Sequence, residues 1–127
     1  MFTNKKKYKK VFCFDFDGVI AKTKKNHYST SLPKKKNISV INLLYKNGYY
    51  IKIYTARFMG RTNDNPIAAK KLASDITLKQ LKNWKVKYHK VYFGKPSFDF
   101  FVDDKSIFYK KNWSIHIKKK FLSKNKY

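Results

Sequence analysis

Two aspartates one residue apart, Asp15 and Asp17, end an apolar run in the stretch V-F-C-F-D-F-D-G-V-I of residues 11–20. Such a run predicts a strand covered on both faces, as in a parallel sheet flanked by helices. Side chains two residues apart on a strand point the same way, so we expect the two carboxylates to converge on one small volume. Because close carboxylates repel unless a cation lies between them, the pair predicts a site for a hard cation, most simply Mg²⁺. The alternative is that Asp17 and Gly18 only turn the chain after the strand.

Other polar residues fall at the ends of three further apolar stretches that we predict to be strands. They are Thr55 after residues 49–54, Lys95 after residues 90–93, and Asp103 with Asp104 after residues 98–102. The carboxyl ends of parallel strands meet at one edge of a sheet, where ligands of such folds bind. Together with the first pair, these side chains supply a nucleophile, a second carboxylate, a hydroxyl, a cation and further metal ligands. This is the inventory of a phosphoryl-transfer site.

The only two arginines, Arg57 and Arg61, share one loop in a chain that otherwise uses lysine for its positive charge. A planar guanidinium fork suits a phosphate or a carboxylate, so we expect both arginines to contact the substrate. The alternative is that they are ordinary surface cations.

Helical segments separate the predicted strands. Asn37 is expected to cap a helix that ends at Asn47-Gly48, and Pro66 to open helical sequence through Trp84 with a break near residues 75–77. Residues 18–36 predict a loop or flap, residues 107–109 a helical turn, and residues 113–117 an edge strand. Strands alternating with helices predict right-handed βαβ units and a three-layer αβα, Rossmann-like α/β fold with a mainly parallel sheet and no sizeable cap domain. We expect one domain over residues 1–127, with a basic arm at 1–10 and a frayed tail at 118–127.

The formal net charge of +24 comes from 31 Lys plus Arg against 7 acidic residues. Such a charge can indicate a nucleic-acid binder, but the lysines are spread along the whole chain, which favours a compositional habit of the source. A positive field still attracts any phosphorylated substrate. No apolar stretch is long enough to span a membrane and no secretory signal is recognisable, so a cytoplasmic protein is expected. The single Cys13 is expected to be a buried core residue.

The chain resembles the haloacid-dehalogenase (HAD) superfamily of phosphatases and phosphotransferases. The resemblance lies in D-F-D-G, in I-K-I-Y-T ending at Thr55, in G-K-P around Lys95 and in V-D-D, which occur in the order of the four family motifs over residues 11–105. Within the superfamily, T-A-R-F-M, F-G-K-P and F-V-D-D-K are similar to the small capsule biosynthesis phosphatases. Val19 is a departure, because many relatives have a threonine there.

The resemblance implies a role for each matched catalytic residue. Asp15 would attack phosphorus and form an aspartyl-phosphate, and Asp17 would protonate the leaving oxygen and then activate water. Thr55 and Lys95 would donate hydrogen bonds to the phosphoryl oxygens.

The resemblance also implies a Mg²⁺ ion held by Asp15, by the backbone carbonyl of Asp17 and by Asp103. Asp104 would orient Lys95 or a metal-bound water. Neither gap between motifs holds a folded cap, so an open site is expected. An open site suits a large substrate, or an oligomer in which a neighbouring copy supplies the lid.

The preferred hypothesis is therefore a Mg²⁺-dependent phosphomonoester hydrolase acting on a sugar phosphate in capsule or surface polysaccharide biosynthesis. Two alternatives stay open. One is a polynucleotide phosphatase, which the open site and basic surface would suit, and the other is a non-catalytic, basic nucleic-acid-binding module.

Overall fold

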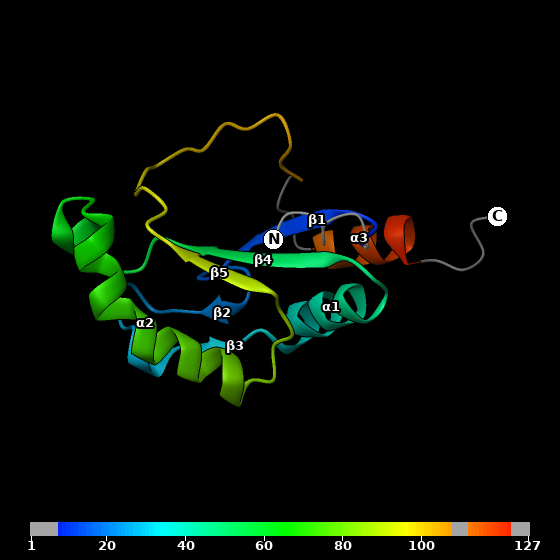
Figure 1. Ribbon diagram of the computed structural model, residues 1–127, viewed down its shortest axis with the longest axis horizontal. Helices are drawn as coiled ribbons and strands as arrows, with labels where there is room; N and C mark the ends of the chain where they lie inside the picture. Colours follow the sequence, from blue (N-terminus) through cyan, green and yellow to red (C-terminus); the bar gives the residue numbers. More distant parts are fainter. Residues whose placement is uncertain (1–7, 108–111, 123–127) are drawn as a thin grey trace.

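A parallel sheet of three strands forms the centre of the computed structural model, which describes residues 8–107 and 112–122 (Figure 1). The strand order is β1 (Val11–Asp15), β4 (Tyr50–Thr55) and β5 (Lys90–Phe93). Helix α1 (Lys35–Lys46) connects β1 to β4, and α2 (Pro66–Asn83) connects β4 to β5. The predicted α/β class, with a parallel sheet in a Rossmann-like arrangement, is confirmed.

Helix α1 forms because its apolar residues recur at helical spacing and face the sheet. Ile38, Ile41 and Leu44 are buried, and the helix stops before Gly48, which has a φ of +90° that glycine adopts without steric cost. Asn37 lies inside the helix rather than at its start. Its side-chain amide donates to the carbonyl of Val19 (2.8 Å), so it ties α1 to the chain beyond β1.

Helix α2 begins where the sequence predicts. The Asn65 side chain accepts hydrogen bonds from the amides of Ile67 and Ala68, and Pro66 occupies the first turn, where its missing N–H has no intrahelical partner to lose. The predicted break near residues 75–77 is wrong, because α2 continues for 18 residues to Asn83.

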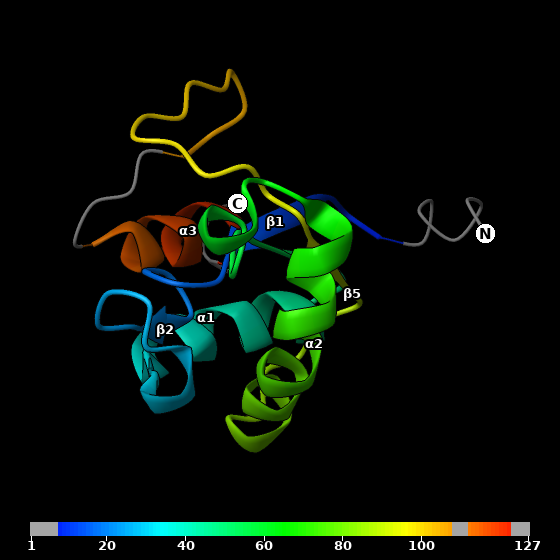
Figure 2. The same ribbon diagram turned by 90° about the vertical axis from the view of Figure 1, so that its left-hand side faces the viewer.

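One face of the sheet is covered by the helices. Phe14, Ile51 and Ile53 point to this face and belong to the hydrophobic core, together with buried residues of α1 and α2. Helix α3 (Trp113–Phe121) joins the same core, since the Trp113 ring lies 5.9 Å from the Phe14 ring. Residues 94–107, called here the 94–107 loop, lie on the other side of the sheet from α1 and α2 in both views (Figures 1 and 2).

The opposite face is less covered than the sequence suggested. Val11 is 45% exposed and Cys13 is exposed, so the expectation that β1 is buried on both faces, with Cys13 in the core, is wrong. An apolar run does not specify on which faces helices will pack.

Two further predictions fail near the C-terminus. Residues 98–102 lie in the 94–107 loop and form no strand, and residues 113–117 form the start of α3 rather than an edge strand. The helix also includes the first residues of the expected tail. Residues 1–7 of the expected arm, residues 108 and 109 of the expected helical turn, and residues 123–127 of the tail lie outside the described residues.

The predicted flap over residues 18–36 contains a small amount of regular structure. Strands β2 (Ala21–Lys22) and β3 (Leu32–Pro33) pair antiparallel, and a 3₁₀ turn, η2 (Tyr28–Thr30), lies between them. A second 3₁₀ turn, η3 (Gly60–Thr62), follows β4. Within the described parts of the chain, every helix is too short or too polar to cross a lipid bilayer.

Candidate functional site

Asp15 and Lys95 meet at the carboxyl edge of the sheet. The Lys95 ammonium lies 3.4 Å from Oδ2 of Asp15, and the Lys95 side chain is only 13% exposed. The Lys95 amide donates to the carbonyl of Thr55 at the tip of β4 (3.1 Å), which fixes where the lysine leaves the strand. The amide of Phe16 donates to Oδ1 of Asp15 (2.9 Å). Asp15 and Lys95 therefore come together at one edge of the sheet, as predicted.

The pKa of the Asp15 carboxyl is raised above its ordinary value. Burial is the main cause, because it removes water that would solvate the charge. The Lys95 ammonium and the Phe16 amide oppose the shift by stabilising the carboxylate, and the neighbouring Asp17 adds to it.

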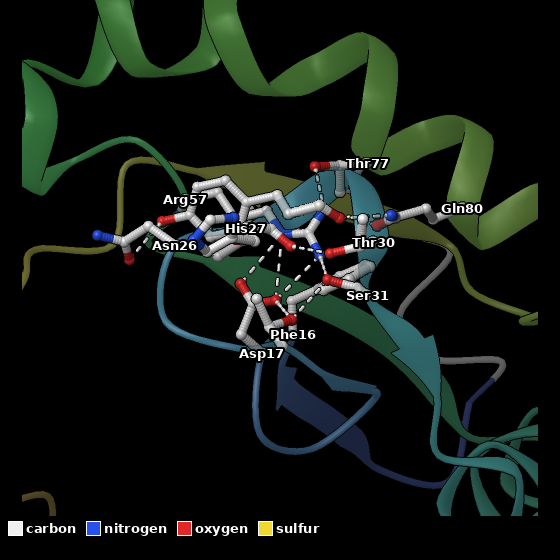
Figure 3. A network of polar contacts seen from close by, with 12 residues as sticks. Phe16, Asp17, Asn26, His27, Thr30, Ser31, Arg57, Thr77 and Gln80 are labelled. Carbon is white, nitrogen blue, oxygen red and sulfur yellow. Dashed lines mark hydrogen bonds and ion pairs between the residues drawn. The ribbon is translucent and has the colours of Figure 1, made fainter.

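Asp17 is held by Arg57 in a two-pronged ion pair (Figure 3). Nε of Arg57 lies 3.0 Å from Oδ2 and 3.2 Å from Oδ1 of Asp17, and Nη2 lies 2.9 Å from Oδ1. Thr23 donates a further hydrogen bond to Oδ1. Since Oδ1 accepts three of these bonds and Oδ2 only one, Oδ2 is the oxygen with capacity left for a reacting group.

The remaining donors of Arg57 are used inside the protein. Nη1 donates to Thr77 (3.2 Å) and Gln80 (2.7 Å) on α2, and Nη2 donates to Ser31 (3.2 Å) in the flap. The guanidinium also lies 4.2 Å from the centre of the Phe16 ring. All five N–H groups of the guanidinium are thereby engaged, and the residue is 1% exposed.

This arrangement corrects the expected role of Arg57. A buried guanidinium without a spare donor cannot contact a leaving group, so Arg57 positions Asp17 instead of binding substrate. These contacts, called here the Arg57 clamp, join the chain just after β1, the flap, the loop after β4 and α2 around one carboxylate.

Arg61 differs from Arg57, because it is exposed. Its guanidinium lies 4.7 Å from the Phe58 ring and 5.4 Å from the Tyr28 ring, and Nη2 donates to the carbonyl of Asn26 (2.7 Å). Phe58 has a φ of +64°, a left-handed conformation that is uncommon for a bulky residue and turns its ring toward Tyr28. Within the described residues Arg61 donates only to the Asn26 carbonyl, and its substrate contact stays a prediction.

Thr55 is fully buried at the tip of β4, one residue beyond the position that pairs with Asp15. Its hydroxyl accepts a hydrogen bond from the Arg57 amide (3.1 Å), and its carbonyl accepts the bond from the Lys95 amide. Thr55 thus fixes the backbone positions of Arg57 and Lys95.

Asp103 and Asp104 are not brought to this edge. Both are exposed in the 94–107 loop, which arches away from the sheet (Figure 1), and Oδ1 of Asp103 accepts from the Lys105 amide (2.9 Å). Among the described residues, no group of three or more acidic, histidine or cysteine side chains could hold a metal ion. Asp15 pairs with Lys95 and Asp17 with Arg57, while Asp103 lies in the 94–107 loop, so the implied Mg²⁺ ligands are not brought together in this arrangement.

The sequence did not reveal four polar residues that hold the clamp, namely Thr23, Ser31, Thr77 and Gln80. The available signal was an arginine two residues after Thr55, in a chain that otherwise uses lysine apart from Arg61. Its partners are distant in sequence and carry no motif, so they required the fold.

Comparison with known proteins shows the fold and no family. No protein-family model and no curated protein matches the chain. An MCSG target protein from Vibrio cholerae has a similar structure, with a TM-score of 0.70 and 25% identity over 77% of this chain and 82% of that one. Two structures of the Pnkp1/Rnl/Hen1 RNA repair complex also match, each at 12% identity, with TM-scores of 0.53 and 0.50. This chain spans 36% and 32% of those two chains, while 92% and 91% of its own length is covered. The likenesses show a mixed α/β fold.

Proposed function

We propose that the protein is a phosphomonoester hydrolase that works through an aspartyl-phosphate on Asp15. The observation that carries the proposal is the Asp15–Lys95 pair, 3.4 Å apart at the carboxyl edge of a parallel sheet, beside a second carboxylate fixed by a buried arginine. A phosphoryl group entering there would meet a nucleophile, a cation and a proton carrier at once.

The proposed reaction has two steps. An oxygen of Asp15 attacks phosphorus, the bond from phosphorus to the leaving oxygen breaks, and Asp17, which must enter this step carrying a proton, gives that proton to the leaving oxygen. A water molecule then attacks the phosphorus, transfers its proton to Asp17 and releases inorganic phosphate from Asp15. Lys95 stabilises the charge on the phosphoryl oxygens in both transition states.

The experiment that tests this proposal is hydrolysis of p-nitrophenyl phosphate by the purified chain. We expect phosphate release that Asp15→Asn reduces by at least about a thousandfold, because an amide does not form the covalent intermediate. An unchanged rate in Asp15→Asn, or no hydrolysis of any compound in a panel of phosphorylated metabolites, would contradict the proposal.

A Mg²⁺ requirement is part of the proposal and rests on the sequence, through the close carboxylates of Asp15 and Asp17 and through the family resemblance. The third implied ligand, Asp103, would have to approach the strand tips, so we expect Mg²⁺ to slow amide hydrogen exchange over residues 98–104. EDTA should abolish activity. Asp103→Asn should abolish both the activity and the slowing of hydrogen exchange by Mg²⁺. Full activity in EDTA would show that the hydrolysis is metal-independent.

For the substrate, the resemblance to the small capsule biosynthesis phosphatases supports a sugar phosphate of surface polysaccharide synthesis. A second candidate, a polynucleotide end, is supported by the basic composition and by a fold like that found in an RNA repair complex. The metabolite panel should therefore include sugar phosphates and phosphorylated oligonucleotides side by side.

A further inference from the structure

The sheet face away from the helices carries an alternation of tyrosine and lysine. In strand register, Val11 and Cys13 of β1 pair with Tyr50 and Lys52 of β4, and Lys52 and Tyr54 pair with Lys90 and Tyr92 of β5. Paired residues of a parallel sheet point to the same side. The open face is therefore made by Val11, Cys13, Tyr50, Lys52, Tyr54, Lys90 and Tyr92.

Two tyrosine rings of this face, those of Tyr54 and Tyr92, lie close to ammonium groups. Lys52 and Lys90 lie 5.6 and 5.9 Å from the centre of the Tyr92 ring, which is 40% exposed. Lys95 lies 6.0 Å from the centre of the Tyr54 ring. Proteins that bind single-stranded nucleic acid combine these two features, since bases stack on aromatic rings while cations follow the phosphates.

The open face leads directly into the candidate site. Asp15 pairs in register with Tyr54, and the Lys95 ammonium lies 3.4 Å from Oδ2 of Asp15 and 6.0 Å from the centre of the Tyr54 ring. The 94–107 loop adds a second aromatic element on this side. Its Phe98 and Phe101 rings stack 4.9 Å apart, are 45% and 55% exposed, and each lie 5.4 Å from Lys95.

We propose that the open face binds a single-stranded nucleic acid and presents its terminal phosphate to Asp15. The delivery of the phosphate rests on the proposed function, while the binding itself does not. A duplex is disfavoured because its bases are stacked on each other and cannot lie on tyrosine rings. A second copy of the chain is disfavoured because Lys52 and Lys90 would face like charges across the contact.

Binding is tested with the Asp15→Asn protein, so that hydrolysis does not consume the ligand. Fluorescence anisotropy is measured with a labelled single strand of about ten nucleotides that carries a 3′-phosphate, within the site sizes of such proteins. RNA and DNA of the same sequence are compared, and the tighter one identifies the preferred sugar. Tyr92→Ala should weaken binding about tenfold, because stacking on one ring is lost.

The control separates this face from the general positive charge. The double variant Lys52→Gln with Lys90→Gln is compared with Lys70→Gln and Lys71→Gln, which removes the same charge from exposed positions on α2. We expect the first pair to weaken binding at least about fivefold more than the second. Equal losses would show non-specific attraction and overturn the inference.

The remaining outcomes distinguish the inference from the proposed function. Phosphate release from small esters without any oligonucleotide binding overturns the inference and leaves the phosphatase proposal standing. Binding that Tyr92→Ala weakens, in a protein that hydrolyses nothing, supports the inference and overturns the phosphatase proposal. A dimer that Tyr92→Ala dissociates, again without oligonucleotide binding, would assign the open face to a second copy.

Discussion

The reactivity expected of Asp15 depends on its charge, and two opposing influences set that charge. Burial raises the pKa of the Asp15 carboxyl, and Lys95 counteracts burial. A nucleophilic carboxylate must be ionised, so the rate of a phosphatase of this design falls as pH drops through the pKa of Asp15. The acid limb of its pH profile should therefore lie above the range of an ordinary aspartate.

Replacing Lys95 tests this balance. In Lys95→Met the cation that lowers the pKa of Asp15 is gone, so the acid limb of kcat/KM for p-nitrophenyl phosphate should move to higher pH while the plateau also falls. Lys105→Met, an exposed change in the same loop, should leave the limb in place. If the acid limb of Lys95→Met does not move, or moves to lower pH, the result contradicts the pairing of Asp15 with Lys95.

The same raised pKa predicts a stability effect. The folded state binds the Asp15 proton more tightly than the unfolded state, so ionised Asp15 destabilises the fold at pH values above its folded pKa. Asp15→Asn should therefore raise Tm at neutral pH. The difference in Tm should shrink as pH falls through the raised pKa, because the wild-type carboxyl is then also neutral. Thermal scans across this pH range measure it, and a lower Tm for Asp15→Asn at neutral pH would contradict it.

Replacing Arg57 tests the clamp, and the same replacement at Arg61 is the control. A lysine at position 57 cannot donate to Asp17, Thr77 and Gln80 together, so buried acceptors are left unpaired. Arg57→Lys should lower the free energy of unfolding by about 3 kcal/mol and lower kcat/KM as well. Arg61→Lys, at an exposed position, should change stability by no more than about 0.5 kcal/mol. Urea unfolding of the two variants makes the comparison, and equal effects would show that the clamp is dispensable.

At the scale of elements, the sequence predicted the strands and helix ends that are specified by neighbouring residues alone. The third strand of the sheet, Lys90–Phe93, and the start of α2 at Pro66 were predicted at the residues where they occur. Residues 98–102 were not, because an apolar run becomes a strand only when a neighbouring strand offers its edge. Residues 113–117 form the start of a helix. The sequence pattern missed this helix because the surface on which it packs, the Phe14 face of the sheet, cannot be recognised from local sequence.

The turn after β5 sets the direction of Lys95 and gives an element-level prediction. Gly94 has a φ of +92°, and a Cβ added there would lie 2.9 Å from Cβ of Pro66 at the start of α2. Gly94→Ala should therefore destabilise the fold by about 2 kcal/mol and reduce kcat as the turn shifts Lys95. At Gly60 an added Cβ meets nothing within 4 Å, so Gly60→Ala is the matched control and should be close to neutral. Equal stability of the two variants in urea unfolding would show that the turn tolerates a side chain.

At the scale of the whole molecule, the sequence predicted the fold class and part of the site. Asp15 with Lys95 followed from where the strands end, whereas the Arg57 clamp and the open face depend on which elements pack on which side. Tyr50, Lys52 and Tyr54 alternate along β4, and the open face could have been suspected from that pattern. Only the structure shows that the helices of residues 8–107 and 112–122 leave this side of the sheet uncovered.

The net charge of +24 belongs to the molecule as a whole and predicts how salt acts on it. A strongly positive protein attracts an anionic substrate over a distance of about the Debye length, which shrinks from ~10 Å at 0.1 M salt to ~3 Å at 1 M. We expect kcat/KM for a phosphomonoester to fall as NaCl is added, with kcat nearly unchanged, because encounter is screened while chemistry within the site is not.

The size of this salt effect also separates the two substrate classes. Each phosphate that the open face neutralises adds to the slope of log kcat/KM against log salt, so a phosphorylated oligonucleotide should show a steeper slope than a sugar phosphate. The variant Lys52→Gln with Lys90→Gln should reduce the slope for the oligonucleotide and leave that for the sugar phosphate almost unchanged. Equal slopes for both substrates in the wild type would mean that the charge acts as a diffuse field and that the open face does not follow a phosphate backbone.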